Sequence, residues 1–135
     1  MDISVYNDLY DSVKTYMSTE YPSLSVVHFS PKQTKYPMLV LKENRNTPTY
    51  VARVGRQVTA SLGYVFDIYA STVGNQTQQT IVRNIAAKID TFMFSLNRIP
   101  RTSYNEFENV DGEGKVYRAS IVYSMRYLEN KKIIY

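Results

Sequence analysis

The sequence predicts a single α+β domain of two layers, in which two main helices pack on one face of a mostly antiparallel sheet. Two segments, residues 5–17 and 81–96, repeat apolar side chains at helical spacing. Two others, residues 59–71 and 116–127, alternate apolar and polar side chains as strands do. A length of 135 residues is ordinary for one domain, so residues 1–135 are expected to fold as one unit.

The first segment is expected to form an amphipathic helix, with Asp2 or Ser4 as its N-cap. Pro22 disfavours a helical conformation at Tyr21, so the helix should end before that residue. The side chains expected to face the core are Val5, Leu9, Val13, Tyr16 and Met17.

Strands are expected to follow this helix. Residues 24–29 and 36–43 are short apolar segments with strand character. Residues 44–57 contain Pro48 and Gly55, which predicts either a loop or the two arms of a flexible hairpin. The long strand after them carries on one face the apolar side chains Leu62, Tyr64, Phe66, Ile68 and Ala70.

The clearest helix of the sequence is expected at residues 77–96. Asn75, with Gln78 three residues later, resembles a capping box, although Thr77 could serve as the cap instead. The helix should stop near Asn97, ahead of the next proline. Its apolar stripe consists of Ile81, Val82, Ile85, Ala86, Ile89, Phe92, Met93 and Leu96.

A C-terminal β-hairpin is expected to complete the fold. Residues 102–110 and 116–127 are its strands, and residues 111–114 form the turn between them. One face of the second strand is apolar and aromatic, with Tyr117 and Tyr123, and it should pack on the second helix. The opposite face is left for solvent or a neighbouring protein, and it carries Val116, Arg118, Ser120, Val122, Ser124 and Arg126.

The composition excludes several classes of protein. No apolar segment approaches the roughly 18 residues that a membrane helix requires, so no membrane association is expected. The N-terminus is acidic and polar, which is not typical of a signal peptide. Cysteine is absent, so neither disulfides nor thiolate metal sites can form. The cytoplasm is the simplest compartment, and an exported particle is also compatible with this composition.

The net charge of +4 is unevenly distributed. Residues 1–20 and 101–113 are acidic, whereas residues 30–60 are strongly basic. The basic region contains Lys32, Lys35, Lys42, Arg45, Arg53 and Arg56, with Glu43 as its only acid. Regions of opposite charge could steer the chain into self-association. Three separate solvated surfaces explain the same pattern at least equally well.

Residues that could support catalysis do not form a known motif. His28 lies in an apolar segment and is expected to be a partly buried structural residue. An enzyme would need His28 and an acid such as Asp67 to share a cleft. Asp90 is an isolated acid, and Asp111 and Glu113 belong to an expected turn. Because no glycine-rich phosphate-binding pattern occurs either, we expect no enzymatic activity, no cofactor and no metal.

Two binding surfaces are predicted. Arg45, Arg53 and Arg56 could contact phosphate from the basic segment, which makes a small basic nucleic-acid-binding module an alternative function. The polar face of the long strands combines apolar, tyrosine and oppositely charged side chains, as subunit contacts do. The residues of this possible subunit interface are Asp67, Tyr69, Arg118 and Arg126.

The order of elements resembles the tail terminator proteins of long-tailed bacteriophages, also described as tail-completion or head–tail joining proteins. The resemblance lies in an N-terminal helix leading to "YPMLVLKE", in "GYVFDIYAS" followed by "NIAAKIDTFMFSLN", and in the closing hairpin "NEFENVDGEGKVYRASIVYSMRY". It extends from about Val5 to Tyr127 and rests on size, element order and the texture of these segments.

This resemblance implies a structural virion protein without enzymatic activity, assembled in the host cytoplasm as a ring that is usually hexameric. Such a ring caps the tail tube, ends its polymerisation and joins it to the head connector, or stopper, protein. DNA passes through its lumen without sequence-specific binding. Within this framework we infer that the basic loop faces the lumen or the tail tube, through Lys32, Lys35, Arg45, Arg53 and Arg56.

Overall fold

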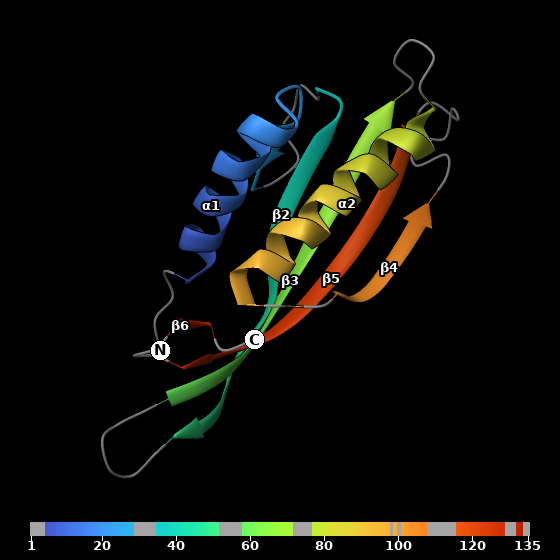
Figure 1. Cartoon of the computed structure of the whole chain (residues 1–135). Coiled ribbons are helices and arrows are strands. Elements are labelled where there is room, and N and C mark those ends of the chain that lie inside the picture. The colour runs from blue at the N-terminus through green and yellow to red at the C-terminus, as the bar shows by residue number, and fades with distance from the viewer. Residues whose placement is uncertain are drawn as a thin grey trace.

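A computed structural model of the chain shows a helical layer on a twisted sheet (Figure 1). It describes residues 5–28, 35–51, 58–71, 77–97, 99, 101–107, 116–128 and 132–133. The elements are α1 (Val5–Glu20), β1 (Ser25–Val27), β2 (Met38–Val51), β3 (Val58–Ser71), α2 (Gln78–Asn97), β4 (Arg101–Phe107), β5 (Val116–Leu128) and β6 (Lys132–Ile133).

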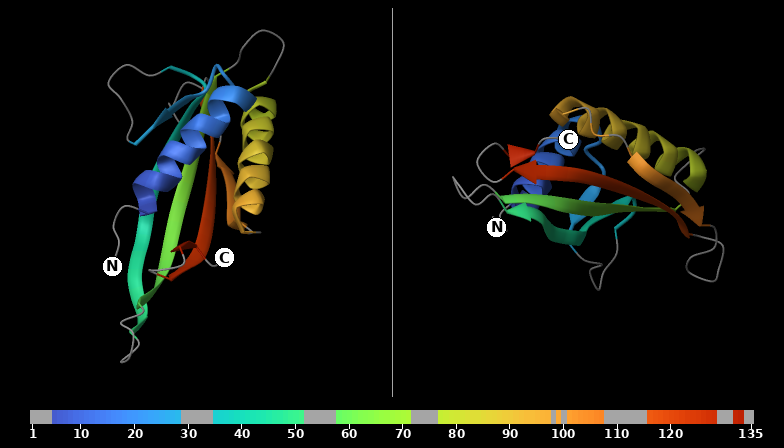
Figure 2. Two further views of the ribbon diagram at one scale, coloured as in Figure 1. Left: turned by 60° about the vertical axis from the view of Figure 1, so that its left-hand side comes forward. Right: turned by 90° about the horizontal axis from the view of Figure 1, so that it is seen from below.

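The strands of the sheet lie in the order β1-β2-β3-β5-β4, and the short β6 pairs with β5. β1 runs parallel to β2, and all other pairs are antiparallel. Both helices lie on the same side of the sheet, as the view from below shows (Figure 2). The predicted α+β class, with two helices on one face of a mostly antiparallel sheet, is confirmed.

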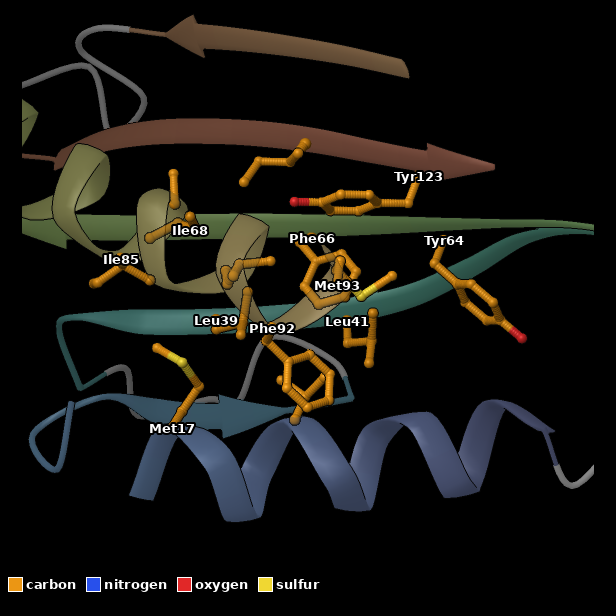
Figure 3. Close-up of a cluster of buried hydrophobic side chains, with 14 of the residues drawn as sticks. Met17, Leu39, Leu41, Tyr64, Phe66, Ile68, Ile85, Phe92, Met93 and Tyr123 are labelled. Atoms are coloured by element: carbon orange, nitrogen blue, oxygen red, sulfur yellow. The ribbon is translucent and has the colours of Figure 1, made fainter. Parts of the chain in front are cut away.

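The core lies between the helices and the apolar faces of β2, β3 and β5 (Figure 3). Phe66 of β3 and Tyr123 of β5 meet edge to face there, with ring centroids 5.3 Å apart. Both side chains are fully buried, as is Tyr64. The sequence-based expectation that these aromatic residues belong to the core is therefore confirmed.

α1 buries one stripe of side chains and ends where the sequence predicts. Leu9, Val13 and Met17 are buried, and Tyr10, which the predicted stripe omitted, is buried as well. The helix ends at Glu20, directly before the Tyr21–Pro22 pair. The two predicted N-caps, Asp2 and Ser4, lie outside the described residues, and so does the Val5 side chain.

α2 begins at a threonine cap. The Thr77 hydroxyl accepts a hydrogen bond from the Thr80 backbone N–H at 3.3 Å, as N-cap residues do. Thr77 is thus the cap, while the alternative cap Asn75 lies outside the described residues. The predicted stripe is buried except for its last member, Leu96, which is 40% exposed. Leu96 lies in the final turn of α2, one residue before the helix ends.

β2 and β3 form a hairpin whose first strand is much longer than the predicted one. The segment expected at 36–43 continues in β2 to Val51, so the described part of 44–57 forms hairpin arms rather than a loop. Register shifts between Glu43 and Arg45 and between Pro48 and Tyr50 mark two bulges in β2. The far end of this hairpin extends beyond the helices (Figure 1). The predicted strand at 59–71 coincides with β3 to within one residue.

The closing hairpin is confirmed, with β4 antiparallel to β5. β4 ends at Phe107, and the rest of the predicted 102–110 strand lies outside the described residues. β5 pairs with β4 on one side and with β3 on the other, so the long strand predicted at 116–127 lies inside the sheet.

Candidate functional site

The face of the sheet opposite the helices, here called the open face, collects the polar positions of four strands. Cross-strand partners point to the same side of a sheet, so the pairs Tyr69–Arg118 and Val65–Val122 place these side chains together. The exposed or half-exposed side chains that carry the argument below are Lys42, Arg45, Val65, Tyr69, Phe107, Arg118 and Val122, with the buried Asp67 among them.

Asp67 lies at the centre of the open face and is only 1% exposed. Arg118 donates a hydrogen bond to one of its carboxylate oxygens at 3.1 Å, and the Lys42 ammonium lies 3.5 Å from the other. A buried carboxylate is strongly unfavourable unless cations and hydrogen bonds compensate for lost water. The two cations therefore compensate the buried Asp67 carboxylate within the sheet surface.

Arg118 links this carboxylate to the apolar part of the open face. Its guanidinium lies 5.8 Å from the Tyr69 ring centre and 5.0 Å from that of Phe107. Its Nε atom is buried and has no hydrogen-bond partner among the described residues. Arg118 thus forms a planar, cationic centre with aromatic rings beside it, and side chains of this type are enriched in protein interfaces.

The bulge at Asn44 places Arg45 on the open face. Beyond the bulge, Arg45 is opposite Gly63, and its side chain is exposed. A Cβ atom at Gly63 would collide with the Asn44 side chain and lie 3.1 Å from the Arg45 Cβ. Glycine therefore suits this position, because the bulged strand approaches it closely.

The predicted basic loop is only partly described. Lys32, Arg53 and Arg56 lie outside the described residues, whereas Lys35 and Arg45 are both exposed. Arg45 belongs to β2 rather than to a loop. Lys35 precedes β2, whereas Arg45 lies seven residues beyond the first residue of that strand, a span of roughly 20 Å at about 3.3 Å per residue.

The predicted subunit interface comes together in part. Asp67, Tyr69 and Arg118 are neighbours on the open face. Arg126 pairs with Ser61 across the two strands, and its side chain is not among those that the structure describes. Lys42 and Phe107 were not predicted as members. Their positions depend on the β2–β3 and β4–β5 registers, which alternation within one strand does not reveal.

A second polar cluster ties α2 to the sheet on the covered side. Arg83 binds both carboxylate oxygens of Glu106, at 2.9 and 3.0 Å. The hydroxyls of Tyr104 and Tyr117 donate to the same carboxylate at 3.1 and 3.2 Å. The Arg83 hydrogen bonds, together with those of the tyrosines, lower the pKa of Glu106, while burial raises the pKa of Tyr104 to about 12.

Asp90 of α2 anchors the same edge. It accepts a hydrogen bond from the Tyr123 hydroxyl and lies 3.2 Å from the Arg101 guanidinium. Burial, with this hydrogen bond, raises the pKa of Tyr123. A shallow depression of about 270 Å³ lies between α2 and β4, with Arg83, Asp90, Arg101 and Tyr104 among its lining residues. Each charged side chain that lines the depression is already in an ion pair. We therefore assign these residues to stabilising the contact between α2 and the sheet, not to binding a ligand.

His28 does not form a catalytic pair with Asp67. Its ring stacks on the Tyr10 ring, with the two ring centroids 3.6 Å apart, and its Nδ1 lies 2.8 Å from the Tyr6 hydroxyl oxygen. That hydroxyl donates its hydrogen to the Leu41 carbonyl, so toward His28 it accepts a hydrogen bond from the Nδ1–H group. These contacts lie on the helical side, opposite Asp67. The expectation that His28 is partly buried is wrong. His28 is exposed and follows Val27, the last residue of β1.

Within the described ranges, no three His, Cys, Asp or Glu side chains gather in a way that could hold a metal ion. None of the helices described is long and apolar enough to cross a membrane. No protein-family model and no curated protein sequence that was compared matches this chain. The open face is therefore the candidate functional site on the strength of its own residues.

Proposed function

We propose that the chain is a structural protein of a phage head–tail junction, which assembles into a ring, caps the tail tube and joins it to the head connector. The resemblance in segment order to tail terminators motivates this proposal, and the α+β fold agrees with it. The protein would act in the virion after assembly in the host cytoplasm, without enzymatic activity.

The observation that carries the proposal is the open face. Its charged centre, Asp67 with Lys42 and Arg118, is surrounded by half-exposed Val65, Tyr69 and Val122. Isolated surface salt bridges contribute little to stability, and a buried carboxylate on a helix-free surface is costly to maintain. A surface of this kind is explained if a neighbouring subunit covers it.

The long hairpin supplies a second element of the proposal. It extends beyond the helical layer, so it could reach the tail tube protein below a ring (Figure 1). Lys35 is exposed, and we propose that it faces the lumen or tube together with Lys32, Arg53 and Arg56, whereas Arg45 lies in β2 on the open face and is left for the subunit contact. DNA passing through the lumen would meet these cations without sequence-specific recognition.

The first test is the mass of the purified protein in solution, measured by light scattering over a range of protein concentrations, with electron microscopy of the same samples. We expect a discrete species of about six subunits with a central channel. A series of open-ended polymers, or a chain that stays monomeric at the highest concentration and does not cap purified tail tubes, would contradict the proposal.

A nucleic-acid-binding module is the second candidate, because Lys42, Arg45 and Arg118 share one face. This function requires binding to DNA or RNA that weakens steeply as salt rises. The ring protein should bind weakly when free. Tight, salt-dependent binding by a monomeric chain would favour the second candidate over the first.

A further inference from the structure

The open face and the outer side of α1 differ in charge. On the open face, Lys42 and Arg45 are exposed, and Arg45 has no ion-pair partner among the described residues. On the outer side of α1, Asp8 and Asp11 are exposed and likewise have no ion-pair partner in the part of the chain that the structure describes. The other acid of that helix, Glu20, is paired with Lys88 at 3.5 Å.

The outer side of α1 also has a suitable shape. A shallow depression of about 410 Å³ is lined by Asp11, Ser12, Thr15 and Tyr16. It combines the Asp11 carboxylate, the hydroxyl groups of Ser12, Thr15 and Tyr16, and the aromatic ring of Tyr16. A long basic side chain can place its aliphatic part on such a ring while its charged end meets the carboxylate.

We propose that the open face of one copy binds the outer side of α1 of a second copy, with Lys42 and Arg45 directed at Asp8 and Asp11. This inference rests on the proposed self-assembly and adds the two surfaces that meet. Tyr69, Phe107 and Val122 supply the apolar part of the contact, as the centres of interfaces do.

Geometry and charge both favour this head-to-tail arrangement over a symmetric pair. Two open faces placed against each other would bring Lys42, Arg45 and Arg118 of each copy together, and like charges repel. α1 and the open face lie on opposite sides of the two-layer body (Figure 2). The two surfaces of one copy therefore cannot contact each other, and each requires a different copy as its partner. A contact between two different surfaces repeats from copy to copy and closes into a ring when the rotation permits.

The first experiment is a charge exchange between two variants. Arg45→Glu and Asp11→Lys should each weaken assembly by about threefold to tenfold per contact in dissociation constant, as loss of an exposed ion pair followed by repulsion predicts. When the two variants are mixed, each altered surface meets its complement, so alternating rings should form again. Assembly of the mixture no better than that of either variant alone would overturn the proposed contact.

The second experiment decides the contact whatever the wild-type mass is. The chain contains no cysteine, so Arg45→Cys combined with Asp11→Cys introduces the only two thiols. Under mild oxidation at high protein concentration, these should link copies into a ladder, about tenfold faster than the control, because a specific contact raises the local thiol concentration. The matched control combines Arg45→Cys with Asn84→Cys, an exposed position on α2. Equal rates for the two pairs would exclude the contact.

The two failures are distinguishable. A wild-type ring with equal cross-linking rates leaves the ring proposal intact and removes this interface. Preferential linkage through Asp11→Cys in a protein that forms open chains keeps the interface and removes the closed ring.

Discussion

The two faces of the sheet bury charge in opposite ways. On the covered face the centre is apolar, and the carboxylates Glu106 and Asp90 lie at the edge, where α2 meets β4 and β5. On the open face the carboxylate Asp67 is at the centre, and apolar side chains surround it. The covered face is thus arranged as a domain core is, whereas the open face has the composition of a contact surface.

This difference indicates which residues serve the fold and which are available for a partner. Removing water from the covered face is the main source of stability, because apolar burial dominates folding. Burial of Asp67 on the open face adds no hydrophobic stabilisation, and the cost of removing its carboxylate from water is offset by Lys42 and Arg118. The predictions below separate these roles.

The largest effect is expected in the covered face. Ile85 is fully buried in α2, so Ile85→Ala should lower the free energy of unfolding by about 2–5 kcal/mol, as core truncations do. Urea denaturation measures this change. Thr91→Ala, on the exposed side of the same helix, should change stability by less than about 0.5 kcal/mol. Similar losses in both variants would mean that the helix is not anchored by this stripe.

The next largest effect is expected at the centre of the open face. Arg118→Ala leaves Asp67 buried with Lys42 alone, and should cost about 2–3 kcal/mol of unfolding free energy. Lys42→Ala should cost less than about 1 kcal/mol, since that side chain is 54% exposed. Adding Asp67→Asn to Arg118→Ala should recover part of the loss. An Arg118→Ala variant as stable as Lys42→Ala would show that Asp67 does not depend on the guanidinium.

A smaller loss is expected at the bulge. Gly63→Ala introduces a methyl group where the Asn44 side chain lies, and should destabilise by about 1–3 kcal/mol, as overpacking does. Ser124→Ala, at the cross-strand partner of Gly63, is the control and should be near neutral. Combining Gly63→Ala with Asn44→Ala should restore stability, as thermal unfolding can establish. No recovery in the double variant would place the strain elsewhere.

The smallest effect is expected at the edge of the covered face. Glu106→Gln should cost about 1 kcal/mol at neutral pH, through loss of charge-assisted hydrogen bonds. Because the folded-state pKa of Glu106 is lowered, its contribution is complete above the ordinary value of 4.5 and is lost as pH falls through the lower folded value. The stability difference between wild type and variant should therefore shrink on acidification. Glu20→Gln, at an exposed pair, should show little such change; a constant Glu106 difference would contradict this linkage.

The sequence predicts most of the fold because its periodicities are long and clean. The stripe from Ile81 to Met93 and the alternation of β5 both appear as expected in the structure. The extent of β2 was less predictable, since proline is rare inside strands and Pro48 therefore suggests that the strand ends before it. A bulge beside it, with a register shift between Pro48 and Tyr50, lets the strand continue.

The candidate site was predicted only where one strand suffices to define it. Alternation within β3 and β5 assigns Asp67 and Arg118 to the same side, and their proximity follows once these strands pair. Lys42 and Phe107 belong to two further strands, so their addition requires both registers and the bulge count. Sequence analysis names Arg118 as a possible interface residue, but alternation does not reveal that a buried carboxylate depends on it.

The position of β5 shapes how the chain reaches its native state. β5 inserts between β3 and β4, although α2 and β4 precede it along the chain. Until β5 is synthesised and docked, β3 is paired with β2 on one side only, and β4 has no strand to pair with. An unpaired strand edge recruits other chains, and non-local pairing is slow. The hazardous interval for aggregation during synthesis is thus the wait for residues 116–128, after the segments of both helices have been synthesised.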